Sequence, residues 1–188
     1  MLRKKMRIVG AVGQIGSGKD TVVNYIAAKC SILIISIGDI AREIAKSRGL
    51  SPTRQNLQQI TEEHYQRFGK TYFIEETTKR IKDAGYKKVL ITGIRAPTDV
   101  TTLKKLFHND FILICVIAHE RKRFQRLKSR EEARDPKTWQ EFLAQDRNEE
   151  KIFQVSESCE LADYAIENNG TLEELLQKID SVLEEIGW

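Results

Sequence analysis

The chain has 188 residues, and its 40% hydrophobic and 31% charged content indicates one folded domain and excludes a disordered chain. The net charge of +4 is too small to indicate bulk binding of nucleic acid, which is therefore not an expected partner. The three cysteines form no C-x-x-C pair and predict reduced, mostly buried thiols. The longest apolar run, residues 111–118, is too short to cross a membrane, so we expect a cytoplasmic protein without a membrane partner.

Short apolar segments that are typical of strands alternate along the chain with segments of helical periodicity. Strands are predicted over residues 6–12, 32–37, 88–92, 111–118 and 162–167. Helices are predicted over residues 19–29, 38–47, 51–68, 72–84 and 97–107, and again from residues 135 and 171 onward. Proline predicts two of these helix starts, at Ser51-Pro52 and at Asp135-Pro136. This alternation predicts an α/β fold with a five-stranded parallel sheet, and ligands of such sheets bind beyond the carboxyl ends of the strands.

A glycine-rich turn stands between the first predicted strand and the helix that follows it. It reads Gly13-Gln14-Ile15-Gly16-Ser17-Gly18-Lys19-Asp20, with Thr21 directly after it. Glycines let bare N–H groups approach an anion, the helix points its positive end at the same place, and Lys19 adds a mobile charge. The spacing is that of the phosphate-binding P-loop, whose last position is normally Ser or Thr and contacts Mg²⁺. Asp20 departs from that pattern, so Asp20 and Thr21 are both candidate metal ligands.

Polar side chains also follow the second and third predicted strands. Asp39 and Arg42 are three residues apart at a helix start, so both can lie on one face, and Arg95 comes directly after the third strand. Taken alone, these residues also fit a helix cap paired with an arginine and a solvated surface charge. Two arginines at neighbouring strand ends, facing a P-loop, nevertheless suit a second anion beside the terminal phosphate of a nucleotide.

A highly charged stretch over residues 119–151 contains regularly spaced arginines. They are Arg123, Arg126, Arg130 and Arg134, and Arg147 lies near the end of the stretch. The spacing of the first four places them on one face of a helix, which fits a solvated basic face or a lid that closes over a nucleotide. A guanidinium group suits the lid because it is planar for stacking on a base and forked for binding phosphate oxygens.

Several segments resemble those of the P-loop nucleoside monophosphate kinases. The shared pattern covers nearly the whole chain and reads G-x-x-G-S-G-K, S-I-G-D-x-x-R, G-I-R-x-x-x-D-V, R-F-x-R-L, D-P-x-x-W and A-D-Y-x-I-x-N. It is most similar to archaeal nucleotide-kinase-like proteins related to dephospho-CoA kinase, and two segments are also similar to animal phosphomevalonate kinase. The resemblance implies a three-layer α-β-α P-loop NTPase fold in one domain. Its core would comprise residues 1–38, 86–119 and 160–188, with acceptor-binding helices over 39–85 and a lid over 120–150.

The resemblance also implies the roles of the residues near the acceptor. Arg42 and Arg95 would hold the phosphate of the acceptor, and Asp39 would lie near the transferred group, in the water shell of Mg²⁺ or orienting the acceptor. Thr92 departs from the family pattern, because related kinases often have an aspartate at the end of the third strand. That departure puts the coordination of Mg²⁺ in doubt and leaves Asp20 and Asp39 as the main carboxylates for the ion.

On the nucleotide side, the resemblance implies that Lys19 and the P-loop hold the phosphates of ATP. Arg126 would stack on the adenine ring, and Arg130, four residues later, would reach the phosphates. Arg134 and Arg147 are weaker candidates for the same clamp. Asn168 lies in a polar turn that fits either a contact with adenine or a simple helix start.

The implied reaction is transfer of the γ-phosphoryl group of ATP to a small phosphorylated acceptor. A nucleoside monophosphate is the first expected acceptor, dephospho-CoA the alternative and phosphomevalonate a distant third. A P-loop ATPase that binds RNA or a protein partner is the alternative from another class. Thr92 and the basic 121–134 segment favour that alternative, whereas Arg42 and Arg95 count against it, because a pure ATPase has no need of a second phosphate site.

Overall fold

The computed structural model describes residues 7–188 apart from residues 131, 133 and 134 and the side chain of Arg54. Within this part of the chain, five strands form a parallel sheet: β1 (Arg7–Val12), β2 (Leu33–Ser36), β3 (Lys88–Thr92), β4 (Phe111–Ile117) and β5 (Tyr164–Glu167). The strands follow the order β2-β3-β1-β4-β5, so β1 is central. The carboxyl ends of parallel strands lie along one edge, and the segments that follow them therefore converge there.

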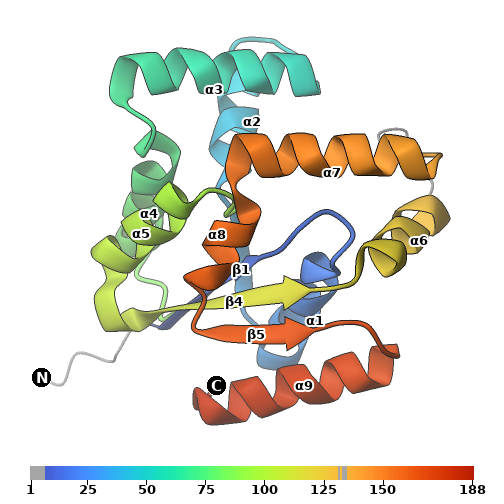
Figure 1. Ribbon diagram of the computed structural model, residues 1–188. Helices are drawn as coiled ribbons and strands as arrows, with labels where there is room; N and C mark the ends of the chain where they lie inside the picture. The colour runs from blue at the N-terminus through green and yellow to red at the C-terminus, as the bar shows by residue number, and fades with distance from the viewer. Residues whose placement is uncertain (1–6, 131, 133–134) are drawn as a thin grey trace, which may run out of the picture.

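Helices connect the strands and cover the sheet (Figure 1). They are α1 (Lys19–Cys30), α2 (Gly38–Ser47), α3 (Arg54–Phe68), α4 (Tyr72–Asp83), α5 (Pro97–Phe107), α6 (Glu120–Arg130), α7 (Trp139–Phe153), α8 (Val155–Glu160) and α9 (Leu172–Glu185), with a short 3₁₀ turn, η1 (His108–Asp110). No helix in the described part of the chain is both long enough and apolar enough to cross a membrane.

Alternate side chains of the strands point to opposite faces of the sheet, and both faces are apolar. Val9 and Ile114 pack with buried residues of α1 and α9 on one face. Ile8 and Leu113 pack with buried residues of α4, α5 and α8 on the other face. Burial on both faces explains why the strands are continuous apolar runs, and it produces the predicted three layers of helix, sheet and helix.

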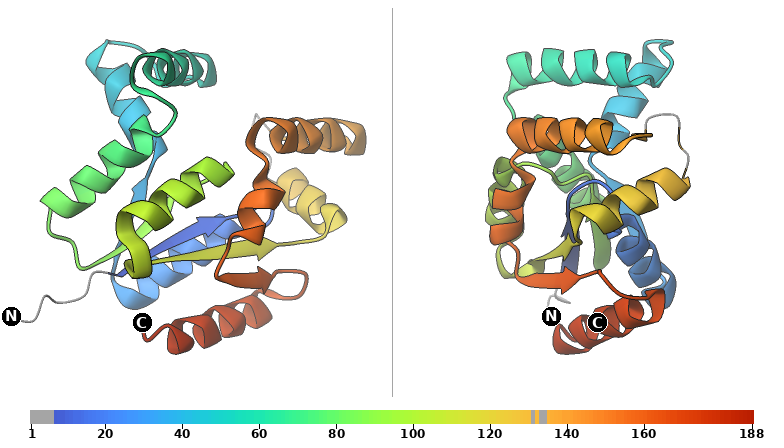
Figure 2. Two further views of the ribbon diagram at one scale, coloured as in Figure 1. Left: turned by 60° about the vertical axis from the view of Figure 1, so that its left-hand side comes forward. Right: turned by 45° about the vertical axis from the view of Figure 1, so that its right-hand side comes forward.

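A smaller apolar cluster lies outside the two sheet-facing cores. It joins α2, α3 and α4 through Ile40, Ala45, Ile60 and Phe73. Figures 1 and 2 show α3 away from the sheet, on the side opposite α9, with α2 leading up to it. Residues 39–85, predicted as acceptor-binding helices, thus include a unit that packs largely against itself.

Two predicted helix starts are wrong by a few residues. α3 begins at Arg54 rather than at Ser51-Pro52, because the Thr53 hydroxyl caps it by accepting the N–H of Asn56 at 3.2 Å. α7 begins at Trp139 rather than at Asp135-Pro136, because Thr138 caps it in the same way. Proline is favoured at the first helical position but also occurs in loops. Here the hydroxyls of Thr53 and Thr138 fix the first residues of α3 and α7.

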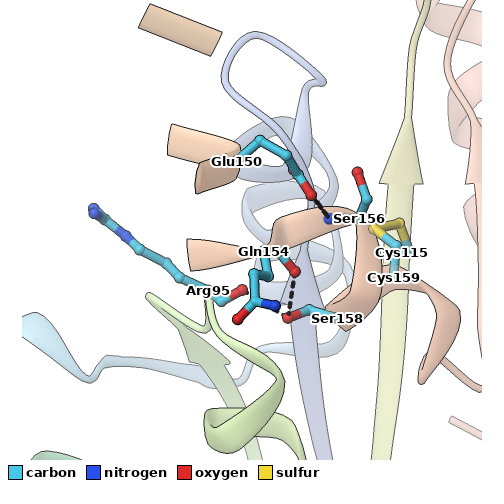
Figure 3. Close-up of a disulfide and its surroundings, with 7 residues drawn as sticks. All are labelled: Arg95, Cys115, Glu150, Gln154, Ser156, Ser158 and Cys159. Carbon is cyan, nitrogen blue, oxygen red and sulfur yellow. Dashed lines mark hydrogen bonds between the residues drawn. A yellow bond between two sulfur atoms is a disulfide. The ribbon is translucent and has the colours of Figure 1, made fainter. Parts of the chain in front are cut away.

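The expectation of reduced thiols is wrong for two of the three cysteines. Cys115 of β4 and Cys159 of α8 form a disulfide, with their Cα atoms 5.2 Å apart, while Cys30 is free (Figure 3). The two residues are 44 positions apart in the sequence and meet because α8, a short helix outside the predicted elements, packs on β4. Cysteine spacing cannot reveal such a pair, since tertiary packing creates the contact.

Candidate functional site: a P-loop between two groups of arginines

The glycine-rich turn links the end of β1, the central strand, to the start of α1. Gly16 and Gly18 have φ angles of 74° and 94°, a region that side chains other than glycine rarely adopt. A Cβ atom on Gly16 would lie 2.7 Å from the carbonyl oxygen of Arg123, and one on Gly18 would lie 2.3 Å from the amide nitrogen of Asn168. These glycines are therefore needed for the fold of the loop and for its close packing against α6 and the segment after β5.

Lys19 begins α1 directly after the loop. Its ammonium group lies 3.7 Å from the Asp20 carboxylate, and the Asp20 side chain is 68% exposed. Thr21 instead lines a hollow of about 240 Å³ with Gly18 and Arg126, on the side of the loop nearer β5. The structure thus separates the two candidate metal ligands. Asp20 is an exposed carboxylate beside Lys19, whereas Thr21 lines the hollow.

The middle of the loop faces the protein. The N–H of Ser17 donates to the carbonyl of Gln14 at 3.1 Å and closes the turn, and the Ser17 hydroxyl is fully buried. Arg123 donates to the carbonyl of Ile15 at 3.2 Å. Arg126 and Asn168 donate to the carbonyl of Ser17 at 3.2 and 2.8 Å. These bonds occupy carbonyl oxygens of the loop and fix its backbone.

Arg123 does not lie on an exposed face with the other arginines of α6. Its side chain is 2% exposed and forms two hydrogen bonds with the Asp146 carboxylate of α7, at 2.6 and 2.7 Å. Its guanidinium also lies 5.1 Å from the ring centre of Phe142. The prediction that Arg123 shares an exposed or ligand-facing surface with the later arginines is therefore wrong. Arg123 instead joins the P-loop to α7.

Arg126 and Asn168, both predicted to contact the nucleotide, lie together beside the P-loop. Arg126 donates to the carbonyl and to the side-chain oxygen of Asn168, at 2.8 and 3.0 Å. Its partners are neutral, so they leave its positive charge uncompensated, and burial lowers the pKa of this guanidinium. A second hollow of about 520 Å³ lies beside the first, and Arg126 and Gly170 line both. The predicted adenine contacts thus lie together at two joined hollows next to the P-loop.

The later arginines of the charged stretch are placed differently. Arg130 lines the larger hollow and is held by the Asp135 carboxylate, whose oxygens accept from its Nε at 2.8 Å and its Nη2 at 2.5 Å. That hydrogen-bonded carboxylate raises the pKa of Arg130, and the charge of Asp20 adds to the rise. Arg147 is exposed on α7. Arg134 lies outside the described residues, so its predicted role stays a prediction.

Asp39 and Arg42 lie in the first turns of α2, where they form an ion pair at 2.5 Å with both side chains about half exposed. β2 and β3 are neighbours, and their last residues, Ser36 and Thr92, are in register. The turn after β3 therefore meets the turn after β2, and the N–H of Ile37 donates to the Thr92 carbonyl at 3.0 Å. The structure thereby brings the two turns that carry the predicted acceptor residues side by side.

Arg95 lies in the turn after β3 and is exposed. The Asp99 carboxylate accepts the backbone N–H groups of Arg95 and Ala96 at 2.9 and 3.0 Å, and burial raises the pKa of that carboxyl. The Arg95 guanidinium lies 4.9 Å from the ring centre of Phe153 at the end of α7. Among the described residues no ion pair holds this guanidinium, which lies against an aromatic ring and interacts with the charge of Asp99 only at longer range.

Sequence reasoning missed the residues that hold these arginines. Asp146 and Phe153 appear in the sequence as ordinary members of a charged helix, and no spacing links them to Arg123 or Arg95. Asp99 does carry a signal, because an acidic residue two positions after Pro97 fits the first turn of a helix and its free N–H groups. The other partners depend on helices that meet only in the folded chain.

Comparisons with known proteins agree with this geometry. A family model described as an AAA domain matches residues 12–142. A UPF0200 protein of Pyrococcus horikoshii is 35% identical over 182 residues, which cover 95% of this chain and 97% of that protein. A UPF0200 protein of Hyperthermus butylicus is 35% identical over 167 residues and covers 89% of this chain and 88% of its own length.

Solved structures of low sequence identity share the fold. Shikimate kinase from Bacteroides thetaiotaomicron matches with a TM-score of 0.63 at 14% identity, over 97% of this chain and 99% of that chain. A gluconokinase from Sinorhizobium meliloti matches with a TM-score of 0.55 at 17% identity, over 98% of this chain and 97% of that chain. The chain therefore shares the P-loop fold of these kinases and belongs to the UPF0200 family.

Proposed function

We propose that this protein is an ATP-dependent kinase that transfers the γ-phosphoryl group of ATP to a small phosphorylated acceptor. A nucleoside monophosphate is the first acceptor that we propose, and dephospho-CoA is the alternative. The observation that carries the proposal is the position of Arg42 and Arg95, in two adjacent turns at the strand ends beside the P-loop. A second anion site beside a nucleotide site suits transfer between two phosphate-bearing molecules better than hydrolysis alone.

Catalysis would rest on positioning and on neutralisation of charge. Lys19 and the N–H groups at the start of α1 would hold the β- and γ-phosphates, and Arg42 and Arg95 would hold the acceptor phosphate in line. With a nucleoside monophosphate as acceptor, the phosphorus–oxygen bond to ADP breaks as a phosphate oxygen of the acceptor bonds to the same phosphorus. ADP then leaves with the electron pair of the broken bond.

The residues beside the loop fit Mg²⁺, which accompanies ATP in such sites. Mg²⁺ uses one or two carboxylates and the substrate phosphates and keeps several waters, so it does not need a cage of protein ligands. Within the described residues no group of three or more His, Cys, Asp or Glu side chains could hold a metal. Asp20, exposed and next to Lys19, is the carboxylate that we propose for the ion, with Asp39 reached through water. When bound, the ion would neutralise charge on the phosphates.

A screen for ATP consumption tests this proposal directly. The purified protein is supplied with Mg²⁺-ATP and, in turn, with AMP, CMP, UMP, GMP, dephospho-CoA and phosphomevalonate, and the phosphorylated product is identified by mass spectrometry. We expect ADP to form together with one phosphorylated acceptor, and we propose the cytoplasm as the place of the reaction because ATP is abundant there. Hydrolysis that needs none of these acceptors and is stimulated only by RNA would contradict the proposal.

A further inference from the structure

Arg95 differs from three other arginines near the P-loop, each of which is held by a carboxylate. The three ion pairs are Arg42–Asp39, Arg123–Asp146 and Arg130–Asp135. In each, the carboxylate offsets the positive charge of the arginine. Among the described residues no ion pair holds the Arg95 guanidinium, which instead lies 4.9 Å from the ring centre of Phe153. The face of an aromatic ring attracts a cation and restrains it without supplying a full negative charge.

The backbone of Arg95 is fixed from two sides. The Asp99 carboxylate of α5 accepts its N–H at 2.9 Å, and the Ser158 hydroxyl of α8 donates to its carbonyl oxygen at 2.7 Å (Figure 3). Figure 3 also shows the Arg95 side chain extending away from α8, with the Cys115–Cys159 disulfide on the opposite side of Ser158. These two hydrogen bonds therefore fix the direction in which the side chain leaves the turn. The guanidinium at its far end is in contact with Phe153.

Phe153 is well suited to restrain that far end. It is the last residue of α7, is partly buried, and packs against the sheet-facing core that includes Cys115. The helix before it is anchored to the P-loop, because Asp146 binds Arg123 and Arg123 binds the Ile15 carbonyl. The ring thus has a fixed position relative to both the nucleotide loop and the Arg95 turn.

We propose that Phe153 is a positioning residue of the acceptor site: its ring holds the Arg95 guanidinium in place and leaves its charge available to the acceptor phosphate. This inference rests on the proposed function only in naming the anion as a phosphorylated acceptor. A salt bridge at this position would compete with the incoming phosphate, whereas an aromatic platform does not. The Arg95 side chain would thereby lose its conformational entropy on folding, and binding of the acceptor would not carry that cost.

Nuclear magnetic resonance of the full chain labelled with ¹⁵N-arginine tests the inference without an assay of activity. The Nε–H signal of Arg95, assigned by its loss in Arg95→Lys, should be displaced by the ring current of Phe153. The displacement should disappear in Phe153→Leu and remain in Phe153→Tyr. Ile152→Ala is the matched control, because Ile152 neighbours Phe153 on α7 and is 58% exposed. Phe153→Met replaces the leucine variant if that variant does not fold.

The same signal is then titrated with inorganic phosphate and with AMP. In Phe153→Leu we expect half-saturation at roughly two- to five-fold higher ligand concentration, the size of one exposed cation–π contact. Phe153→Tyr and Ile152→Ala should titrate like the parent chain. In the kinase assay the leucine variant should raise the KM of the acceptor by the same factor and leave the KM of ATP unchanged.

Three results would overturn the positioning role. They are an Arg95 signal that Phe153→Leu does not move, an equal affinity for phosphate in Phe153→Leu and the parent chain, and a parent chain whose Arg95 signal responds to neither phosphate nor AMP. Failure of the proposed function looks different. In that case phosphate still moves the Arg95 signal and Phe153→Leu still weakens its binding, but no acceptor in the ATP-consumption screen is phosphorylated.

Discussion

The proposed nucleotide side, formed by the P-loop and α6, and the proposed acceptor side, formed by the turns after β2 and β3, use arginine in opposite ways. On the nucleotide side, Arg123 is 2% exposed and Arg126 is partly buried, and both donate to carbonyl oxygens of the P-loop. On the acceptor side, Arg42 has a side chain that is 52% exposed, and Arg95 is exposed beside a ring. The nucleotide side is thus assembled by the protein itself, whereas the cations of the acceptor side still face solvent.

This difference follows from the packing beneath each side. The P-loop lies at the end of the central strand, between two cores that cover both faces of the sheet. Helices α2 and α3 instead pack around a smaller apolar cluster that they share with α4, and α4 also packs on the sheet. A loop clamped between large cores is rigid, while a small satellite cluster permits rearrangement around a substrate.

The largest effect is expected from removing the partner of the buried arginine. Asp146→Ala would leave the Arg123 guanidinium buried without a counter-charge, so we expect the free energy of unfolding to fall by about 3–5 kcal/mol. Urea denaturation measures the change. Glu43→Ala is the control on the acceptor side, because Glu43 is 57% exposed in its pair with Arg80, and less than about 1 kcal/mol should be lost there. Equal losses in the two variants would contradict the contrast between the sides.

Lys19→Ala should separate catalysis from folding on the nucleotide side. We expect turnover to fall roughly 100- to 1,000-fold, because a charge that contacts the transferred phosphate is lost from a prebuilt site. The melting temperature should be unchanged, since Lys19 pairs only loosely with exposed Asp20. Lys29→Ala, at the far end of the same helix, should keep its activity. Near-full phosphoryl transfer by Lys19→Ala would refute the proposed role of the P-loop.

Cys159→Ser should show how firmly α8 is tied to the sheet. The disulfide closes a loop of 44 positions between β4 and α8, and its loss should lower the free energy of unfolding by about 2–4 kcal/mol. Denaturation with and without a reducing agent measures this, and the reduced parent chain should match the variant. Cys30→Ser, which removes the free thiol, should leave stability as it was. A parent chain with the same stability in both conditions would show that the bond contributes nothing.

The smallest of these effects concerns the acceptor side alone. Arg42→Ala and Arg95→Ala should each raise the KM of the acceptor about ten-fold, the equivalent of one charge-assisted hydrogen bond. The KM of ATP should stay constant, because among the described residues no hydrogen bond or ion pair joins either side chain to the P-loop. Arg80→Ala, which removes an exposed arginine of α4, should change neither constant. A rise in the KM of ATP with an unchanged KM of the acceptor would reverse the assignment of the two sides.

The sequence predicted every strand of the sheet and nearly every helix, because each is marked by local signals. β3 and α5 have the predicted bounds, and α9 begins directly after Thr171, as predicted. Errors arose where two local signals competed. At Ser51-Pro52 the proline favoured an early helix start, but the Thr53 hydroxyl three residues before the Asn56 N–H fixed the start of α3.

The residues of the candidate site were predictable where they belong to the chain's own turns. The P-loop, Asp39, Arg42 and Arg95 each follow a strand, and parallel strands bring their carboxyl ends to one edge whatever the rest of the chain does. Helical spacing alone was a weaker guide, because it could not tell which arginines of α6 would be covered. Arg123 is buried only because α7 crosses over it with Asp146.

The sequence by itself therefore determined the sheet, the phosphate loop and the places where charged residues gather, since these depend on neighbours a few positions apart. Only the tertiary structure decided which charged side chains pair with other groups of the protein and which remain exposed to a ligand. The pairs Arg123–Asp146, Arg95–Phe153 and Cys115–Cys159 join segments 23 to 58 positions apart, and no local pattern encodes them. Their formation depends on how α7 and α8 pack over the sheet, which is a property of the whole core.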